Sequence, residues 1–201
     1  MPYIKPVIRE PYYDKPLWIE NEVTREEFTL LSSKSSTAEV ELFLLHLFGY
    51  NGIDASQSFK KSFNELLEED EVAILGGVTF IQDEETFIMP SCCCGLEEFQ
   101  TITNTINANQ SPWLGHDPSP GIKYYEDYVL VWSDDPEIQK EELFSIRFTY
   151  KELLEGLEKC KKDLLGFIEE PLYKWIKVRD EEIANRMKQR MLQWFLKDDY
   201  S

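Results

Sequence analysis

The sequence predicts an α+β protein in which a mixed or antiparallel sheet packs against helices, with long helices toward the C-terminus. Two observations support this class. Hairpin-like strands do not alternate regularly with helices, and the region from about residue 150 to 197 is mostly helical in pattern. The 201 residues are 42% hydrophobic and 13% aromatic, which is enough apolar material for a core. Residues 1–22 are predicted as an extended arm because proline recurs in them, and residues 23–201 as one domain.

Capping patterns and the spacing of apolar residues predict the helices. Thr24 and Glu27 form a capping-box pattern that predicts a short helix over residues 25–32. Apolar residues at helical spacing predict a further helix over about 59–67. Toward the C-terminus, helices are predicted over residues 95–108, 153–168 and 179–196, with a short one starting at Pro171.

Alternating apolar residues and turn residues predict the strands. The apolar run over residues 39–48 is compatible with a buried strand or a short core helix, and the turn residues after it favour the strand. Glycine and polar turns predict a hairpin with strands over residues 72–75, 78–81 and 86–89. An irregular loop over 109–122 then leads to strands over 128–132 and 143–150.

The formal charge of −17 is concentrated in the middle of the chain. Residues 51–150 contain 19 acidic and 5 basic side chains, a net charge of −14. A field of this sign repels nucleic acid and anionic lipid and attracts basic proteins, although solubility is the simpler explanation of acidity. The acidic side chains predicted to bind a basic protein partner are Glu68, Glu69, Asp70, Glu71, Asp83, Glu84, Glu85, Asp134 and Asp135.

The sequence also predicts the compartment. No apolar run approaches the roughly 20 residues of a membrane helix, and the N-terminus lacks an apolar segment of the signal-peptide type. The four cysteines have no disulfide-framework spacing. We therefore expect a cytoplasmic protein with reduced thiols and no membrane contact.

Two segments carry reactive side chains. Cys92, Cys93 and Cys94 precede a predicted helix, whose N-terminal dipole lowers the pKa of a nearby thiol. The second segment places an imidazole beside a carboxylate in a constrained loop that contains Trp113, Gly115, His116 and Asp117.

If the intervening helix folds back, these two segments meet. Cys94, His116 and Asp117 would then form a thiol and base for nucleophilic catalysis. Alternatively, Cys92, Cys94 and His116 would bind Zn²⁺, with Asp117 as a further ligand. Buried cysteines and ordinary turn chemistry are the simpler explanation of the same residues.

Other side chains are interpreted as structural. His46 lies in an apolar run and is predicted to be a core histidine with one hydrogen bond. The basic side chains of the last helix are predicted to form a solvated face; these are Arg179, Arg186, Lys188 and Arg190. The motifs of the commonest enzyme classes are absent, and no cofactor is predicted.

Residues 90–120 resemble a motif pair of an uncharacterised bacterial protein family. The first motif is P-x-C-C-x-G-L-E-x-W, with Phe99 here in the place of the tryptophan, and the second is S-P-W-x-G-H-D-P-x-P, matched at residues 111–120. The segment 148–175 resembles the tail of that family through an Asp-Leu-x-x-F element at 163–167. The resemblance implies no established activity. In general character, small acidic proteins of this kind are similar to immunity proteins of toxin systems.

These observations favour a non-enzymatic, acidic binding protein of the immunity type that neutralises a basic partner. The alternative is a thiol-dependent enzyme or metal site built on Cys92–Cys94 and His116. The partner's identity and an oligomeric state are not predicted.

Overall fold

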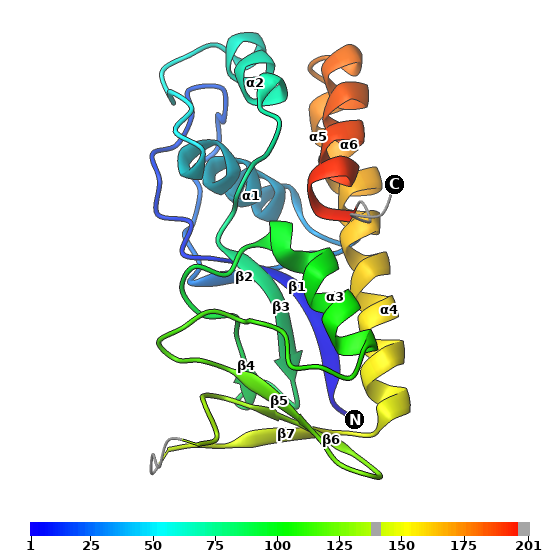
Figure 1. Ribbon diagram of the computed structural model, residues 1–201. Coiled ribbons are helices and arrows are strands. Elements are labelled where there is room, and N and C mark those ends of the chain that lie inside the picture. Colours follow the sequence, from blue (N-terminus) through cyan, green and yellow to red (C-terminus); the bar gives the residue numbers. More distant parts are fainter. Residues whose placement is uncertain (138–141, 197–201) are drawn as a thin grey trace.

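The computed structural model describes residues 1–137 and 142–196 (Figure 1). It contains two antiparallel sheets together with helices, so the predicted α+β class is confirmed. The three-stranded sheet lies at one end of the molecule, whereas α2 and α6 stand side by side at the other (Figure 1).

The larger sheet has the order β2-β1-β3-β4. Its strands are β1 (Tyr3–Arg9), β2 (Phe28–Leu30), β3 (Gly76–Ile81) and β4 (Phe87–Ile88). Strand β1 pairs with a neighbour along each edge, with Val7 opposite both Leu30 and Gly77. The first residues of the predicted arm are therefore extended, but they form an inner strand. Trp18, later in the same segment, packs against Phe48 with ring centroids 5.1 Å apart.

The β3–β4 hairpin confirms two of the three strands predicted around it. The prediction for residues 72–75 is wrong, since these residues precede β3 and Leu75 forms only an isolated bridge to Gly95. Gly76 begins the strand instead of turning it. A Cβ at Gly76 would lie 2.1 Å from the carbonyl oxygen of Val7, so glycine is what lets β1 approach.

The second sheet has the order β5-β6-β7. Its strands are β5 (Gly121–Tyr124), β6 (Val129–Trp132) and β7 (Ser145–Phe148). The last two confirm the predictions over 128–132 and 143–150. Strand β5 begins inside the predicted loop, where Ile122 pairs with Val131.

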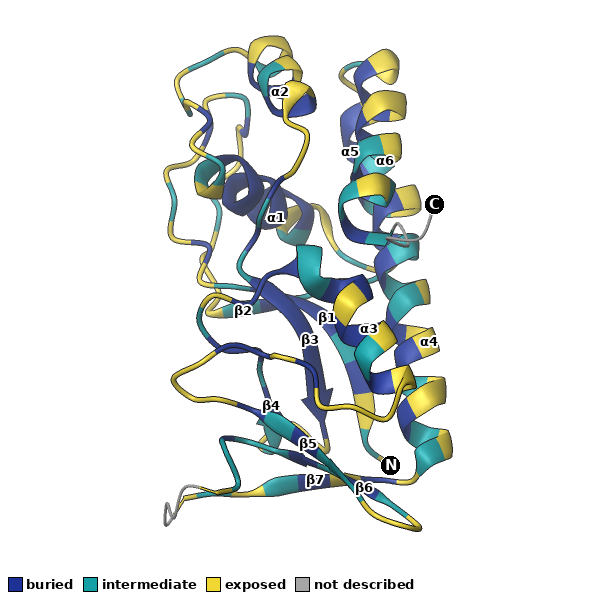
Figure 2. Cartoon of the chain, in the orientation of Figure 1, coloured by how far each residue is buried: buried dark blue, intermediate teal, exposed yellow. Residues whose placement is uncertain are grey.

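The predicted strand over residues 39–48 is wrong, because this segment forms helix α1 (Thr37–Tyr50). Ser36 and Glu39 form a capping box at its start. All nine residues from 40 to 48 are buried (Figure 2). A helix covered on every side has no polar face, so its sequence lacks the periodicity that distinguishes a helix from a buried strand.

The predicted helix over residues 25–32 is also wrong, because the segment contains β2. The carbonyl oxygen of Glu27 accepts a hydrogen bond of 2.9 Å from the backbone N–H of Glu10. Pairing with β1 thus overrides the local capping pattern.

The remaining helices largely follow the predictions. They are α2 (Phe59–Glu68), η1 (Leu96–Glu98), α3 (Phe99–Asn107), α4 (Tyr150–Phe167), η2 (Ile168–Leu172), α5 (Tyr173–Lys177) and α6 (Glu181–Leu196). Helix α4 packs along β1. Pro171 does not start a helix as predicted, because it lies inside η2, a π-helical turn that joins α4 to α5.

His46 on α1 is fully buried, as predicted for a core histidine. The predicted hydrogen bond is absent, since neither ring nitrogen has a partner among the described residues. The ring stacks on Tyr13 with centroids 5.7 Å apart. Burial lowers the pKa of His46 from 6.5 to about 4.

Candidate functional site

The cysteine segment and the His-Asp loop meet in space, as the catalytic and metal hypotheses both require. The backbone N–H of Ser91 donates to the carbonyl oxygen of Leu114 at 2.7 Å, and the Ser91 hydroxyl donates to that of His116 at 2.9 Å. Cys92 and His116 form an antiparallel bridge. These contacts fix the thiols and the imidazole in one register.

Gly115 permits this close contact. Its φ of +99° is unfavourable for other residues, and a Cβ at this position would lie 2.6 Å from the carbonyl oxygen of Cys92. The glycine of the predicted loop therefore has a structural role directly beside the thiols.

Three ligand atoms converge at this contact. The Sγ of Cys92 lies 3.3 Å from Nδ1 of His116 and also contacts the carbonyl oxygen of His116. Adjacent side chains in an extended chain point in opposite directions, but Cys93 has a left-handed backbone with φ +65°. The ligand atoms of Cys92, Cys93 and His116 all lie within 4.8 Å of one another.

Solvent reaches this cluster. Cys92 is half-buried, whereas Cys93 and His116 are exposed. An Oδ2 of Asp117 lies 3.5 Å from Nδ1 of His116, and this side chain is 93% exposed. Desolvation, and then the neighbouring Cys92 thiol, raise the pKa of Cys93. The shift is opposite in direction to the lowering expected from a helix N-terminus.

Cys94 does not belong to the cluster, although it was assigned to both the catalytic and the metal alternatives. It is 1% exposed and packs in the hydrophobic core. Burial, and then the charges of Glu98 and Glu97, raise the pKa of Cys94 to about 12. The sequence missed Cys93 as the second thiol, because only the left-handed conformation turns it toward Cys92.

Trp113 lies in the same loop and is 53% exposed. It lines a hollow of about 430 Å³ together with Pro112, Ser119, Pro120 and other residues of the loop and of β5. The Trp113 ring is thus an exposed aromatic surface in the same loop as His116.

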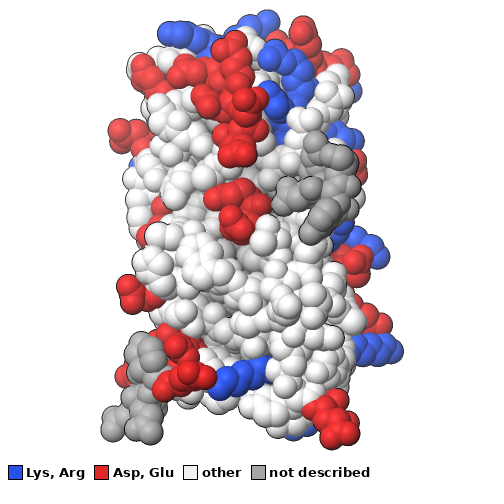
Figure 3. All heavy atoms as spheres, in the orientation of Figure 1, with Lys and Arg blue, Asp and Glu red and all other residues white. Residues whose placement is uncertain are grey.

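The nine acidic residues predicted to bind a partner do not form one surface. Residues 68–71 lie at the end of α2, whereas Asp83 lies in the β3–β4 turn, toward the other end of the molecule (Figure 1). Figure 3 likewise shows acidic side chains in separate groups. Asp83 accepts hydrogen bonds from the N–H groups of Glu85 and Thr86 at 3.0 and 2.8 Å, which lowers the pKa of Asp83.

Asp134, another of the nine, is 7% exposed. Its Oδ1 accepts hydrogen bonds from the N–H groups of Ser119 at 2.7 Å and of Asp135 at 2.8 Å. Asp134 therefore supports the loop that carries His116, and it is too buried to contact a partner.

Part of the acidic set does gather in one place. A hollow of about 730 Å³ is lined by Asp70, Glu71, Glu97 and Glu98, together with Arg190 and Trp194. Glu97 and Glu98 come from the start of η1–α3 and were not among the predicted residues. Burial raises the pKa of Glu97, one of whose carboxylate oxygens accepts the Ile74 N–H at 3.0 Å.

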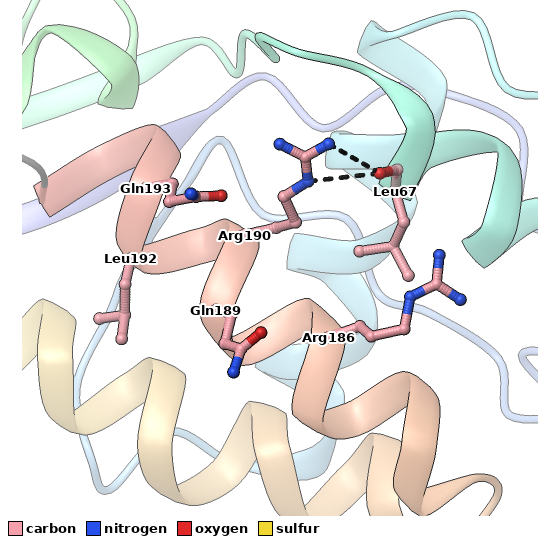
Figure 4. Close-up of a pocket in the computed structure, with 6 residues that line it drawn as sticks. All are labelled: Leu67, Arg186, Gln189, Arg190, Leu192 and Gln193. Atoms are coloured by element: carbon pink, nitrogen blue, oxygen red, sulfur yellow. Dashed lines mark hydrogen bonds between the residues drawn. The ribbon is translucent and has the colours of Figure 1, made fainter.

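The basic side chains of α6 are not a simple solvated face. Arg190 donates through Nε and NH2 to the carbonyl oxygen of Leu67, at 3.3 and 3.1 Å (Figure 4). Arg186 donates to Asn64 at 2.8 Å. These cations lie at the C-terminal end of α2, where the helix dipole is negative. Lys188 pairs with Glu169 at 2.8 Å. The α6 cations thus link α6 to α2 and to η2.

The fold and site define an α+β protein with a Cys-Cys-His cluster on its surface. Comparisons with protein-family models, curated proteins and solved structures found no match. The resemblance of the motif pair therefore stays a prediction. Within residues 1–137 and 142–196, no helix is long and apolar enough to cross a membrane.

Proposed function

We propose that this protein binds a thiophilic transition-metal ion of the Zn²⁺ class through Cys92, Cys93 and His116. The observation that carries the proposal is the convergence of two thiols and one imidazole within 4.8 Å. Tetrahedral Zn²⁺ with bonds of about 2.3 Å to sulfur and 2.0 Å to nitrogen separates these atoms by roughly 3.5 Å. The 3.3 Å between Cys92 Sγ and His116 Nδ1 is close to that separation.

Asp117 is our candidate for the fourth ligand, because its carboxylate lies 3.5 Å from the same ring nitrogen. Three of the ligands come from two packed loops, and the fourth is an exposed carboxylate. A metal ion can therefore enter this site from solvent. The raised pKa of Cys93 argues against thiol catalysis, since a catalytic thiol needs a lowered pKa.

Zinc titration tests the metal site. We expect Cys92→Ser, Cys93→Ser and His116→Ala each to lower the Zn²⁺ affinity by about 100-fold, and Asp117→Asn by about 10-fold, since each removes one ligand. Affinity should also fall as the pH is lowered, because Zn²⁺ displaces thiol protons. Isothermal titration calorimetry, repeated at several pH values, measures these affinities.

Cys94→Ala is the matched control, because Cys94 belongs to the same tripeptide but packs in the core. It should retain wild-type Zn²⁺ affinity. A wild-type protein that does not bind Zn²⁺, or a Cys94→Ala protein that loses the metal as Cys92→Ser does, would show the proposal to be wrong.

The acidic hollow supports a second candidate function, binding of a basic protein partner in the manner of an immunity protein. Asp70, Glu71, Glu97 and Glu98 line one concave surface, and the Trp194 ring at its wall offers an aromatic contact. Complementary charge accelerates association and fixes the orientation of the partner. Of the nine acidic residues predicted to bind a partner, only Asp70 and Glu71 line this hollow.

A labelled decalysine peptide tests the acidic hollow by fluorescence anisotropy. The Asp70→Asn/Glu71→Gln protein should bind it about 10-fold more weakly than the wild type, with a smaller salt dependence. Glu84→Gln/Glu85→Gln is the control, since it removes the same charge from the β3–β4 turn. Equal losses in both double variants would mean that the peptide senses net charge alone, and the hollow would then be no specific site.

A further inference from the structure

A second site is built around Glu41, a carboxyl group in the core of α1. Glu41 is 2% exposed and lies within the run of nine buried residues from 40 to 48. Acidic side chains are almost never fully buried unless they are paired, because an uncompensated charge in the interior is costly. Glu41 therefore needs an explanation that packing alone does not provide.

The hydrogen-bond partners of Glu41 are neutral. Asn21 Nδ2 donates to both carboxylate oxygens, at 3.0 and 3.2 Å, and Trp175 Nε1 donates at 3.2 Å. Within the described part of the chain, Glu41 forms no ion pair. Two carboxylate oxygens offer about four acceptor positions, so these donors leave capacity for another.

Two cations beside this site, Arg179 and Lys174, are engaged elsewhere. The Arg179 guanidinium lies 3.5 Å above the Trp175 ring and donates to the Trp175 carbonyl oxygen at 2.9 Å. Lys174 pairs with Glu170 one helical turn away. Among the described residues, neither of these two cations forms an ion pair with the Glu41 carboxylate.

Glu41 lines a cavity of about 440 Å³, a size typical of small-molecule sites. Its polar walls include Ser35 and Thr37, and its apolar walls include Val40, Pro171 and Val178. The π-helical turn η2 contributes Pro171 to one wall, and α5, which follows it, contributes Trp175. Such turns frequently occur at functional sites.

We propose that this cavity binds a small organic cation, a primary ammonium or guanidinium group on a short carbon chain. The cation forms a charge-assisted hydrogen bond with Glu41, and the chain lies against Val40, Pro171 and Val178. Ca²⁺ is a poorer fit, because it takes six to eight oxygen ligands, whereas the side chains that line the cavity offer one carboxylate, two hydroxyls and one amide oxygen. This cavity is separate from the proposed metal site at Cys92, Cys93 and His116, and the proposal does not depend on that site.

Calorimetric titration with cadaverine and agmatine tests the proposal, with 1,5-pentanediol as the uncharged analogue of cadaverine. We expect saturable 1:1 binding of at least one amine in buffer at about 0.15 M salt, where diffuse surface attraction is screened. Glu41→Gln keeps the side-chain shape and should weaken binding by about 10- to 100-fold. The same variant should raise the melting temperature by about 3 °C, because it removes a buried charge.

Glu22→Gln is the control, since Glu22 is exposed next to Asn21. It should change neither binding nor melting temperature. The proposal is overturned if no amine binds, if pentanediol binds as well as cadaverine, or if Glu41→Gln and Glu22→Gln reduce binding equally. A lower melting temperature for Glu41→Gln would also overturn it, because the carboxylate would then stabilise the fold by itself.

Discussion

Gly115→Ala should lower the Zn²⁺ affinity by about 100-fold while leaving the protein folded. The new Cβ would lie 2.6 Å from the Cys92 carbonyl oxygen and 2.8 Å from the Ser91 Cβ, on a backbone with φ +99°. Strain of this kind costs about 1–3 kcal/mol, which is less than the total stability of a typical domain. The loop can relieve it only by moving His116 away from Cys92, which separates the ligands.

Zinc titration combined with urea unfolding measures both expected effects of Gly115→Ala. Gly121→Ala is the matched control in the same segment, since the nearest atom to its new Cβ is Ser111 Oγ at 3.5 Å. That variant should retain wild-type metal affinity. Wild-type affinity in Gly115→Ala would mean that the close loop contact does not position the ligands.

The free energy of unfolding should fall by about 3 kcal/mol, through His46 alone, as the pH is lowered from 7.5 to 4. The folded-state pKa of His46 is lowered to about 4 from 6.5 by burial. Between these values the unfolded chain binds the proton and the folded protein does not, so acid favours unfolding. The contribution is fully present above pH 6.5 and is lost as the pH falls toward 4.

His46→Phe isolates this effect in urea unfolding at pH 7.5, 6, 5 and 4. Phenylalanine keeps a ring beside Tyr13 and Tyr50, whose centroids lie 5.7 and 5.8 Å from that of His46. The variant should lose most of the decline between pH 6.5 and 4, and it should be more stable at neutral pH because no unpartnered nitrogen is buried. An equal decline in wild type and variant would assign the acid sensitivity to other groups, such as the carboxylate of Asp83.

The sequence predicted the fold class and the helices that have one apolar and one polar face. Helices α4 and α6 have a clear helical spacing of apolar residues, and both form close to where they are predicted. The spacing of apolar residues did not identify α1 as a helix, because every side of this helix is buried from residue 40 to 48. It also failed for β2, which is held by pairing with a strand about twenty residues away in the chain. Such pairing leaves no local signal.

The site was predicted as a pair of segments but not as a set of atoms. Sequence chemistry identified the cysteine run and the His-Asp loop, and it included Cys92 and His116 in the metal alternative. It chose Cys94 as the second thiol, whereas the structure places Cys93 beside Cys92 and buries Cys94. The choice depends on the left-handed backbone of Cys93, which no residue pattern specifies.

The sequence by itself determined the composition of the core, the negative charge and the two segments that carry thiols and imidazole. Only the tertiary structure decided which of these groups meet. It brought Glu97 and Glu98 to the hollow beside Asp70, buried Asp134 under the His116 loop, and set Glu41 among neutral donors. The physical reason is that spacing along the chain fixes local geometry, whereas the distance between groups on separate segments depends on how the strands pair and the core packs.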